Sequence, residues 1–279
     1  MEEYILQTQG LRYAYDGEKY ALQHASLAVR AGERVAVLGS NGAGKSTFFL
    51  CLNGVLTPQG GTVSLHGREV GAKERNLLRE HVGIVFQNAD DQIIASTVQA
   101  EVSFGPMNLR LPKEEVCRRV DRAVDYMALE AFRTRPPHYL SGGEKKRVSI
   151  ADIIAMESEV ILFDEPAASL DPAGTCMLED VLRRLTEEGK TLLISTHDMD
   201  FAFRWADRAV VFCEGEVIAD GTPLNVFRDD EIIERARLRR PAMLDVFESL
   251  SRRGLVPRDA ACPKTPVELE RLLENHRVD

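Results

Sequence analysis

A glycine-rich segment, GSNGAGKST, occupies residues 39–47 and follows a short apolar run. It fits the pattern G-x-x-x-x-G-K-[S/T], in which backbone N–H groups and a helix N-terminus surround phosphate groups. A lysine in this position reaches the β- and γ-phosphates, and the next hydroxyl is a ligand for Mg²⁺. A plain glycine-rich turn is the alternative. We expect a nucleoside triphosphate to be held by Gly39, Ser40, Asn41, Gly42, Ala43, Gly44, Lys45, Ser46 and Thr47.

Two adjacent carboxylates follow a second apolar run at residues 160–163. Asp164 is suited to hold Mg²⁺ together with Ser46, and Glu165 is suited to accept a proton from an attacking water molecule. Taken alone, an Asp-Glu pair at a strand end also fits a solvated turn. Because a phosphate-binding segment occurs in the same chain, we interpret the pair as catalytic.

The elements that must position these residues indicate an α/β fold. Short β-branched runs at 33–39, 159–163 and 190–196 alternate with helical stretches, as in buried parallel strands. Short alternating segments in the opening third predict an antiparallel β portion. Apolar residues share one helical stripe in the middle of the chain, which predicts a helical insert: Val116, Val120, Ala123, Val124 and Met127. After about residue 225 a charged, mostly helical appendage is expected.

Composition limits the class of protein. The chain has 279 residues, 44% of them hydrophobic, and a net charge of −9, which argues against nucleic acid as a partner. No apolar run is long enough for a membrane helix, so we expect a cytosolic chain that meets membranes through partners. The five cysteines show no metal or redox spacing. No metal site besides nucleotide-bound Mg²⁺ is expected from the scattered histidines His24, His66, His81, His138, His197 and His276.

The segment LSGGE at residues 140–144 lies between the glycine-rich segment and the acid pair. With it, residues 1 to about 225 resemble the ABC ATPase family, which implies a P-loop NTPase core, an antiparallel β portion and a helical subdomain at about 88–157. The resemblance implies that Tyr15 stacks on adenine, Gln87 contacts Mg²⁺ and water, and His197 senses the γ-phosphate. Alternatively, Tyr15 packs on the β portion, Gln87 is a surface residue, and His197 is an ordinary strand-end histidine.

The LSGGE segment, here called the signature segment, places N–H groups and a hydroxyl at a predicted helix start. In the family this segment closes over the nucleotide of a second subunit, so the resemblance implies a two-fold dimer with two ATP molecules. The residues concerned are Ser141, Gly142, Gly143 and Glu144, and a crossing loop contains Ser169, Leu170 and Asp171. Ser169 stands where the family commonly has glycine, so we expect the backbone of that loop to have less conformational freedom at this position.

Residues 85–106 are similar to the energy-coupling-factor class, especially the cobalt transporter ATP-binding subunit. The resemblance implies uptake of cobalt, nickel or a vitamin, driven from the cytoplasmic face of the membrane. Its implied partners are a second ATPase subunit, equal or different, an integral membrane coupling protein and a substrate-binding membrane subunit. A P-loop GTPase or kinase, and a non-transport ABC ATPase acting on nucleic acid or ribosomes, are the alternatives.

A mixed acidic and apolar surface follows Gln87 directly in the sequence. It comprises Asp90, Asp91, Ile93, Ile94 and Phe104, and we expect it to receive an amphipathic helix of the coupling protein. Alternatively, the three apolar residues only cap the helical insert.

Overall fold

The computed structural model describes residues 4–17, 19–168, 170–257 and 259–275. The opening third forms an antiparallel sheet in the order β2-β1-β4-β5. Its strands are β1 (Tyr4–Ala14), β2 (Tyr20–Arg30), β4 (Gly60–Leu65) and β5 (Arg68–Glu69). Burial alternates over residues 25–30 of β2, as in a sheet with one covered face, whereas register shifts interrupt the alternation along β1. The predicted antiparallel portion is confirmed.

A second, mostly parallel sheet forms the centre of the protein, in the order β10-β9-β3-β8-β7-β6. Only the edge strand β10 runs antiparallel to its neighbour. The strands are β3 (Arg34–Leu38), β6 (Val82–Val85), β7 (Val160–Asp164), β8 (Thr191–Ser195), β9 (Arg208–Cys213) and β10 (Glu216–Gly221). The three apolar runs are therefore strands, and the α/β fold class is confirmed. The β9–β10 hairpin was not expected from the sequence.

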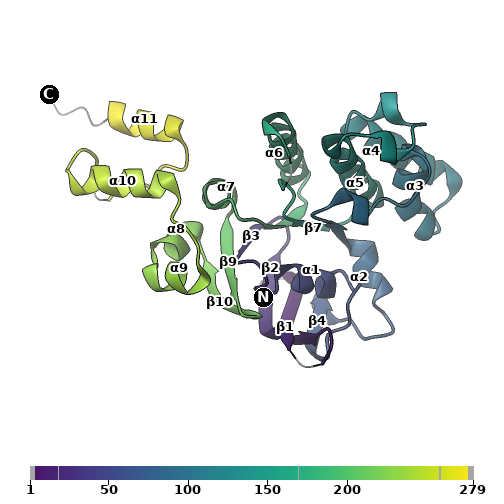
Figure 1. The fold of residues 1–279 in the computed structure, drawn as a ribbon, viewed down its shortest axis with the longest axis horizontal. Helices are drawn as coiled ribbons and strands as arrows, with labels where there is room; N and C mark the ends of the chain where they lie inside the picture. The colour runs from purple at the N-terminus through teal and green to yellow at the C-terminus, as the bar shows by residue number, and fades with distance from the viewer. Residues whose placement is uncertain (1–3, 18, 169, 258, 276–279) are drawn as a thin grey trace.

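A layer of helices stands between β6 and β7 in the chain and projects to one side of the sheets (Figure 1). The predicted apolar stripe lies in α4, where Val120, Ala123 and Val124 are fully buried. Val116 and Met127 also pack in the same apolar cluster. The layer contains η1 (Ala89–Asp91), α3 (Val98–Asn108), α4 (Lys113–Tyr126), η2 (Glu130–Phe132), η3 (Pro137–Tyr139) and α5 (Gly142–Met156).

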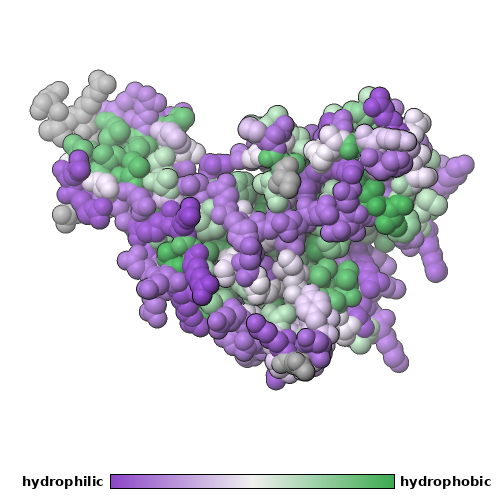
Figure 2. Space-filling model, in the orientation of Figure 1, coloured by the Kyte–Doolittle hydropathy of each residue, from purple (hydrophilic) through white to green (hydrophobic). Residues whose placement is uncertain are grey.

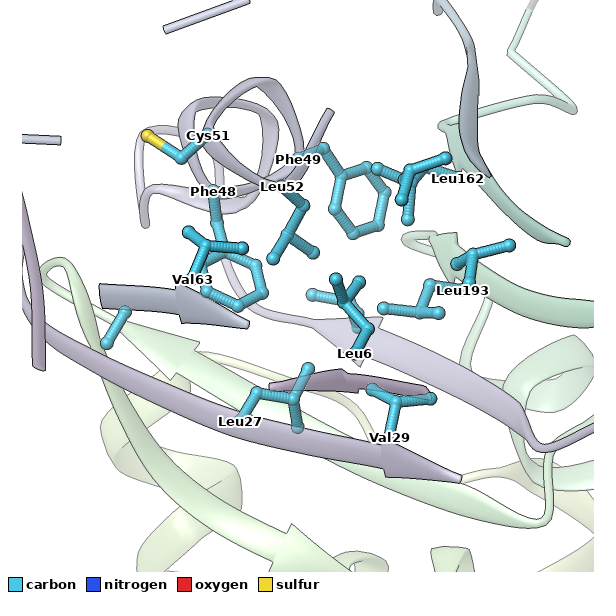
Figure 3. Packing of buried hydrophobic residues seen from close by; sticks show 14 of the residues in the cluster. Leu6, Leu27, Val29, Phe48, Phe49, Cys51, Leu52, Val63, Leu162 and Leu193 are labelled. Carbon is cyan, nitrogen blue, oxygen red and sulfur yellow. The ribbon is translucent and has the colours of Figure 1, made fainter. Parts of the chain in front are cut away.

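Helix α1 (Lys45–Leu52) joins the two sheets. Its Phe48, Phe49 and Leu52 are buried between Leu6 and Val63 of the antiparallel sheet and Leu162 of the parallel one (Figure 3). Burying each of these side chains stabilises the fold by about 1.5–3 kcal/mol. The packing of α1 between the sheets therefore holds its first residues in place. The remaining core helices are α2 (Asn76–His81), α6 (Pro172–Glu187) and α7 (Met199–Trp205).

Four helices make up the last part of the chain: α8 (Pro223–Arg228), α9 (Asp230–Ala236), α10 (Ala242–Arg252) and α11 (Pro266–Glu274). Helix α10 buries Leu244 and Phe247. Residues 276–279, His276 among them, lie outside the described residues. Figure 2 shows apolar surface over α10 and α11. Among the described residues, no helix combines the length and apolar character needed to cross a bilayer.

Candidate nucleotide-binding site

The glycine-rich segment forms a loop between β3 and α1. At Gly39, with φ 142°, an added Cβ would lie 2.4 Å from the Phe212 carbonyl oxygen. At Gly44, with φ 105°, it would lie 2.5 Å from the Ala21 carbonyl oxygen. Gly42 faces open space, and there the positive φ of 77° is what favours glycine. The loop therefore depends on glycine for space at two positions and for conformation at the third.

The loop surrounds a pocket of about 280 Å³. Lys45 is buried at its floor, and its Nζ donates to the carbonyl oxygens of Gly39 at 2.7 Å and Ser40 at 3.2 Å. The pocket is lined by Tyr15, Ala21, Asn41, Gly42, Ala43, Gly44, Lys45, Ser46, Thr47, Gln87, Glu165 and His197. Residues far apart in the sequence and predicted to share one site thus meet around a single cavity.

The acid pair is held at the carboxyl end of β7 by a residue that the sequence analysis missed. The Ser195 hydroxyl donates to Asp164 Oδ1 at 2.6 Å and accepts from the Glu165 backbone N–H at 2.9 Å. Glu165 adopts a left-handed backbone conformation with φ 45°. Its Oε1 lies 2.9 Å from His197 Nε2 and 3.9 Å from Lys45 Nζ. Glu165 is therefore oriented toward the pocket between two nitrogen groups.

The surroundings of Lys45 and Glu165 shift the pKa of both side chains. Burial raises the pKa of the Glu165 carboxyl, while the neighbouring His197 and Lys45 oppose this shift. Burial lowers the pKa of Lys45, and the carboxylates of Glu165 and Asp164 oppose it. A carboxylate with a raised pKa is a better proton acceptor than an exposed one. The arrangement can therefore support activation of a water molecule beside a bound phosphate.

Tyr15 lies at the rim of the pocket. Its side chain is 64% exposed, its ring meets Tyr13 edge to face, and its hydroxyl is 3.1 Å from Thr47 Oγ1. The edge contact with Tyr13 of β1 agrees with the alternative of packing on the β portion, whereas the exposure leaves most of the ring open to solvent. An exposed ring beside a phosphate loop is free to accept a planar base.

Gln87 is exposed at the pocket, and its backbone is attached to the helical layer. The buried Lys146 of α5 donates from Nζ to the carbonyl oxygens of Phe86 at 2.9 Å and Gln87 at 2.7 Å. Burial lowers the pKa of Lys146 to about 8. The sequence analysis assigned no role to this lysine. It connects the signature helix to the loop that carries Gln87.

The signature segment does not line the pocket. Ser141 caps α5: its hydroxyl accepts from the Glu144 N–H at 3.3 Å, and Glu144 Oε2 accepts from the Ser141 N–H at 2.7 Å. This backbone hydrogen bond lowers the pKa of Glu144. Gly142 and Gly143 would have no atom within 4 Å of an added Cβ. Capping hydrogen bonds therefore hold the start of α5 in place, and there is free space beside Gly142 and Gly143.

Asp171 is likewise remote from the pocket lining. It caps α6, and its Oδ1 accepts from the Gly174 N–H at 2.7 Å. Ser169 of the predicted crossing loop lies outside the described residues. The roles assigned to this loop and to the signature segment stay predictions.

A profile of the ABC transporter family matches residues 22–168, more than half of the chain. The chain belongs to the ABC transporter family. It is similar to the energy-coupling factor transporter ATP-binding protein EcfA2 of Methanospirillum hungatei, with 44% identity over 98% of this chain and 69% of the relative. It is also similar to EcfA of Methanocaldococcus jannaschii, with 45% identity over 91% of this chain and 92% of the relative.

Solved ABC cassettes share the fold. The structure of cbiO1 from Clostridium perfringens, part of the ABC transporter complex cbiONQ, aligns with a TM-score of 0.73. It is 39% identical and covers 88% of this chain and 100% of that chain. The cassette MJ0796, a dimer in a post-hydrolysis state with ADP and Pi, aligns with a TM-score of 0.69 and 28% identity, over 78% and 98% of the two chains. The chain is an ATP-binding, ATP-hydrolysing subunit of the energy-coupling-factor type.

The cassette's oxygen donors fit a magnesium ion. Ser46 is exposed at the pocket, and Gln87 faces the same cavity. Asp164 uses Oδ1 for the Ser195 hydroxyl, which orients its carboxylate at the strand end. Hydroxyl, amide and carboxylate oxygens are hard ligands of the kind that Mg²⁺ takes beside phosphate oxygens. Asp164 is not among the residues that line the pocket, so the set of Ser46, Gln87 and Asp164 fits Mg²⁺ by its donor chemistry and stays a prediction.

The histidines are less scattered in the fold than along the chain, and the expectation of no second metal site stays a prediction. The histidines were judged too scattered for a metal site, but His66 and His81 lie close together with Glu159. No sequence spacing signals this group, because its members are contributed by three separate segments.

Proposed function

We propose that the chain is the motor subunit of an importer and hydrolyses Mg-ATP in two composite sites of a dimer. The observation that carries this proposal is the single pocket in which Lys45, Glu165 and His197 meet, while the signature segment stands open elsewhere. A family cassette solved as a dimer with ADP and Pi supports the same arrangement.

The residues of the pocket divide the chemistry among them. Lys45 leaves the carbonyl oxygens of its own loop and neutralises the β- and γ-phosphates. Mg²⁺, held by Ser46, Gln87 and Asp164, supplies charge neutralisation when bound. Glu165 accepts a proton from the attacking water, and His197 keeps its carboxylate in place at 2.9 Å. Ser195 fixes the acid pair at the strand end.

Each composite site needs a second subunit. The signature segment of one subunit would turn the Ser141 hydroxyl and the N–H groups of Gly142 and Gly143 toward the γ-phosphate in the cradle of the other, the cradle being the phosphate-binding loop of residues 39–47. Glu144 would support this segment through its hydrogen bond to the Ser141 N–H. ATP then binds the closed dimer preferentially and hydrolysis releases it. A homodimer and a heterodimer would each contain two such composite nucleotide sites.

The membrane coupling protein docks in a groove of about 450 Å³ between the core and the helical layer. Phe104 lies in its wall and is 48% exposed. Asp152 also lines the groove, and its buried Oδ1 has no hydrogen-bond partner among the described residues. An amphipathic helix with a basic residue would cover the apolar wall and pair with this carboxylate.

The docking surface proposed from the structure differs from the one expected from the sequence. Asp90 and Asp91 do not line the groove, and Asp90 already pairs with Lys145 of α5 at 2.6 Å. Ile94 is 70% exposed, whereas Ile93 packs against the apolar cluster. Reversing the charge of Asp90 would therefore break an internal ion pair, and Phe104 is the better residue to change.

The transported solute is cobalt, nickel or a vitamin, moved inward by a separate substrate-binding membrane subunit. Similarity to EcfA proteins and to a member of the cbiONQ complex supports this class. The chain sits peripherally on the cytoplasmic face. Action on nucleic acid or ribosomes is the rival function, and the net charge of −9 speaks against it.

Affinity purification from host membranes tests the proposal. The tagged wild type should co-purify with integral membrane proteins, and Phe104→Asp should lose them while the isolated subunit keeps its ATPase activity. Val267→Asp, which changes an exposed valine on α11, is the matched control. Co-purification of ribosomes or nucleic acid in place of membrane proteins would overturn the transport function. Retention of the membrane partners by Phe104→Asp would overturn the groove.

A further inference from the structure

Three metal-ligating side chains converge at the edge of the core sheet opposite the nucleotide pocket. His81 ends α2 and directly precedes β6, and Glu159 directly precedes β7. His66 lies in the turn between β4 and β5 of the antiparallel sheet. The carboxyl ends of β6 and β7 lead to Gln87 and Glu165, so this group occupies the amino ends of the same two strands.

The backbone holds the three residues in register. The Glu159 N–H donates to the His81 carbonyl at 3.0 Å, and its own carbonyl accepts from the Thr191 N–H at 3.0 Å. The His66 N–H donates to the Ile5 carbonyl at 2.9 Å. His66 has a positive φ of 49°, a left-handed conformation that a histidine adopts at a cost in free energy. This conformation places the ring beside a neighbouring sheet.

The side chains point to a common centre. His81 Nδ1 lies 2.6 Å from Glu159 Oε1, and His66 Nε2 lies 3.0 Å from Glu159 Oε2. The two imidazole rings meet edge to face at 5.9 Å. Ligand atoms of the three residues all lie within 4.8 Å of one another. Ligands around a tetrahedral zinc ion are roughly 3.3 Å apart, so small side-chain rotations suffice.

The donor set selects the kind of ion. Two imidazole nitrogens and one carboxylate oxygen suit Zn²⁺, Co²⁺ or Ni²⁺, whereas Mg²⁺ prefers oxygen ligands only. The side chains are 35–48% exposed, so an ion can enter from solvent. Three protein ligands leave a coordination position for water.

We propose that His66, His81 and Glu159 bind one divalent transition-metal ion, which joins the antiparallel sheet to the amino ends of β6 and β7. The site is separate from the nucleotide pocket and does not depend on the direction or solute of transport. Without an ion, the same side chains form only histidine–carboxylate hydrogen bonds, and this is the alternative that an experiment must separate.

Metal titration of the full chain provides the test. The chelator-treated, nucleotide-free protein is titrated with Co²⁺ in excess Mg²⁺, and binding is followed by calorimetry and by the visible absorption of bound Co²⁺. We expect one ion per chain that Zn²⁺ displaces. His66→Ala and His81→Ala should each weaken this binding by at least about 100-fold, since a ligand matters more than the residues around it.

His138→Ala, which removes an exposed histidine elsewhere, is the matched control and should bind as wild type does. Binding by exposed thiols is the same in all four proteins and cancels in the comparison. Mg-ATPase activity verifies that each variant is folded, because none of the changed residues lines the nucleotide pocket. Equal Co²⁺ binding by wild type and His81→Ala, or no absorption band in the wild type, would overturn the site.

Discussion

The phosphate loop and helix α5 both carry motif residues, but their polar groups are arranged differently. In the pocket, Glu165 Oε1 lies 2.9 Å from His197 Nε2 and 3.9 Å from Lys45 Nζ of the same chain, although it is buried without a hydrogen bond of good geometry to any residue that the structure describes. Helix α5 begins with the open signature segment and contains Asp152, whose buried Oδ1 has no partner among the described residues. The first region gathers these groups around one cavity of a single chain. The second presents groups to other molecules at two places along one helix.

This difference separates the effects expected in isolated subunits from those that need partners. Changes in the pocket should act on nucleotide binding or hydrolysis directly. Changes at the start of α5 should act on the nucleotide of a second subunit. Changes within α5 should alter stability and docking. Lys146 connects the two regions, because it binds the backbone of Gln87 from α5.

Lys45→Ala should have the largest effect. It removes the buried cation aimed at the β- and γ-phosphates, so hydrolysis should fall by about 1000-fold and ATP affinity should drop. Phosphate release and nucleotide titration measure both quantities. Lys73→Ala, at an exposed lysine, should change neither. Hydrolysis of ATP at the wild-type rate by Lys45→Ala would contradict the role that we assign to the phosphate-binding loop.

Glu165→Gln should lower hydrolysis by about 100-fold or more while ATP binding persists, because the amide keeps the shape but accepts no proton. ATP-bound dimers should then accumulate, and size-exclusion chromatography with Mg-ATP detects them. Glu187→Gln is the control at an exposed glutamate. Unchanged turnover, or a variant that stays monomeric with ATP, would contradict the assignment of Glu165 as the base.

Ser141→Asp tests the open end of α5. Aspartate can replace serine as the helix cap, but its charge repels the γ-phosphate of the second subunit. Hydrolysis should fall by about tenfold or more, while binding of the first ATP stays near the wild-type value. Thr265→Asp, which changes the cap of α11, should have no such effect.

Mixing Ser141→Asp with Lys45→Ala makes the test specific for assembly in trans. In a mixed dimer one composite site pairs an intact cradle with an intact signature segment, and the other site contains both changes. Random mixing should restore about a quarter of wild-type activity if the two sites act independently. An inactive mixture would mean that both motifs act within one subunit.

Sequence motifs predicted the cradle and the acid pair well, because both depend on local chain order. The loop glycines and Lys45 are close neighbours along the chain, and so are the two carboxylates, whereas strand polarity brings the two motifs to one edge of the sheet. Ser195 and Lys146 were missed, since their partners lie about 30 and 60 residues away. The group of His66, His81 and Glu159 was missed for the same reason. Contacts between segments depend on packing, which no local pattern encodes.

Asp152→Asn should have the smallest effect on nucleotide binding and hydrolysis in the isolated subunit, where it should act on stability. Burial raises the pKa of Asp152 from 3.8 to about 7, so its folded-state pKa exceeds the unfolded value. The contribution of this carboxyl to stability is therefore complete below about pH 4 and is lost as the pH rises through 7. Between these pH values the free energy of unfolding of the wild type should fall by up to about 4 kcal/mol relative to that of the variant, whose residue 152 does not titrate.

Urea unfolding of both proteins across this pH range measures the difference, and Asp125→Asn is the control at an exposed aspartate of α4. Parallel pH profiles for wild type and Asp152→Asn would mean that the carboxyl is already satisfied within the chain. A docked basic residue would reverse the preference by favouring the charged form. In membrane complexes containing the coupling protein, the wild type should therefore gain stability over Asp152→Asn at pH 7 and above. Asp152→Asn would then have opposite effects on stability in the isolated subunit and in the membrane complex. No such reversal is expected for changes in the phosphate-binding loop.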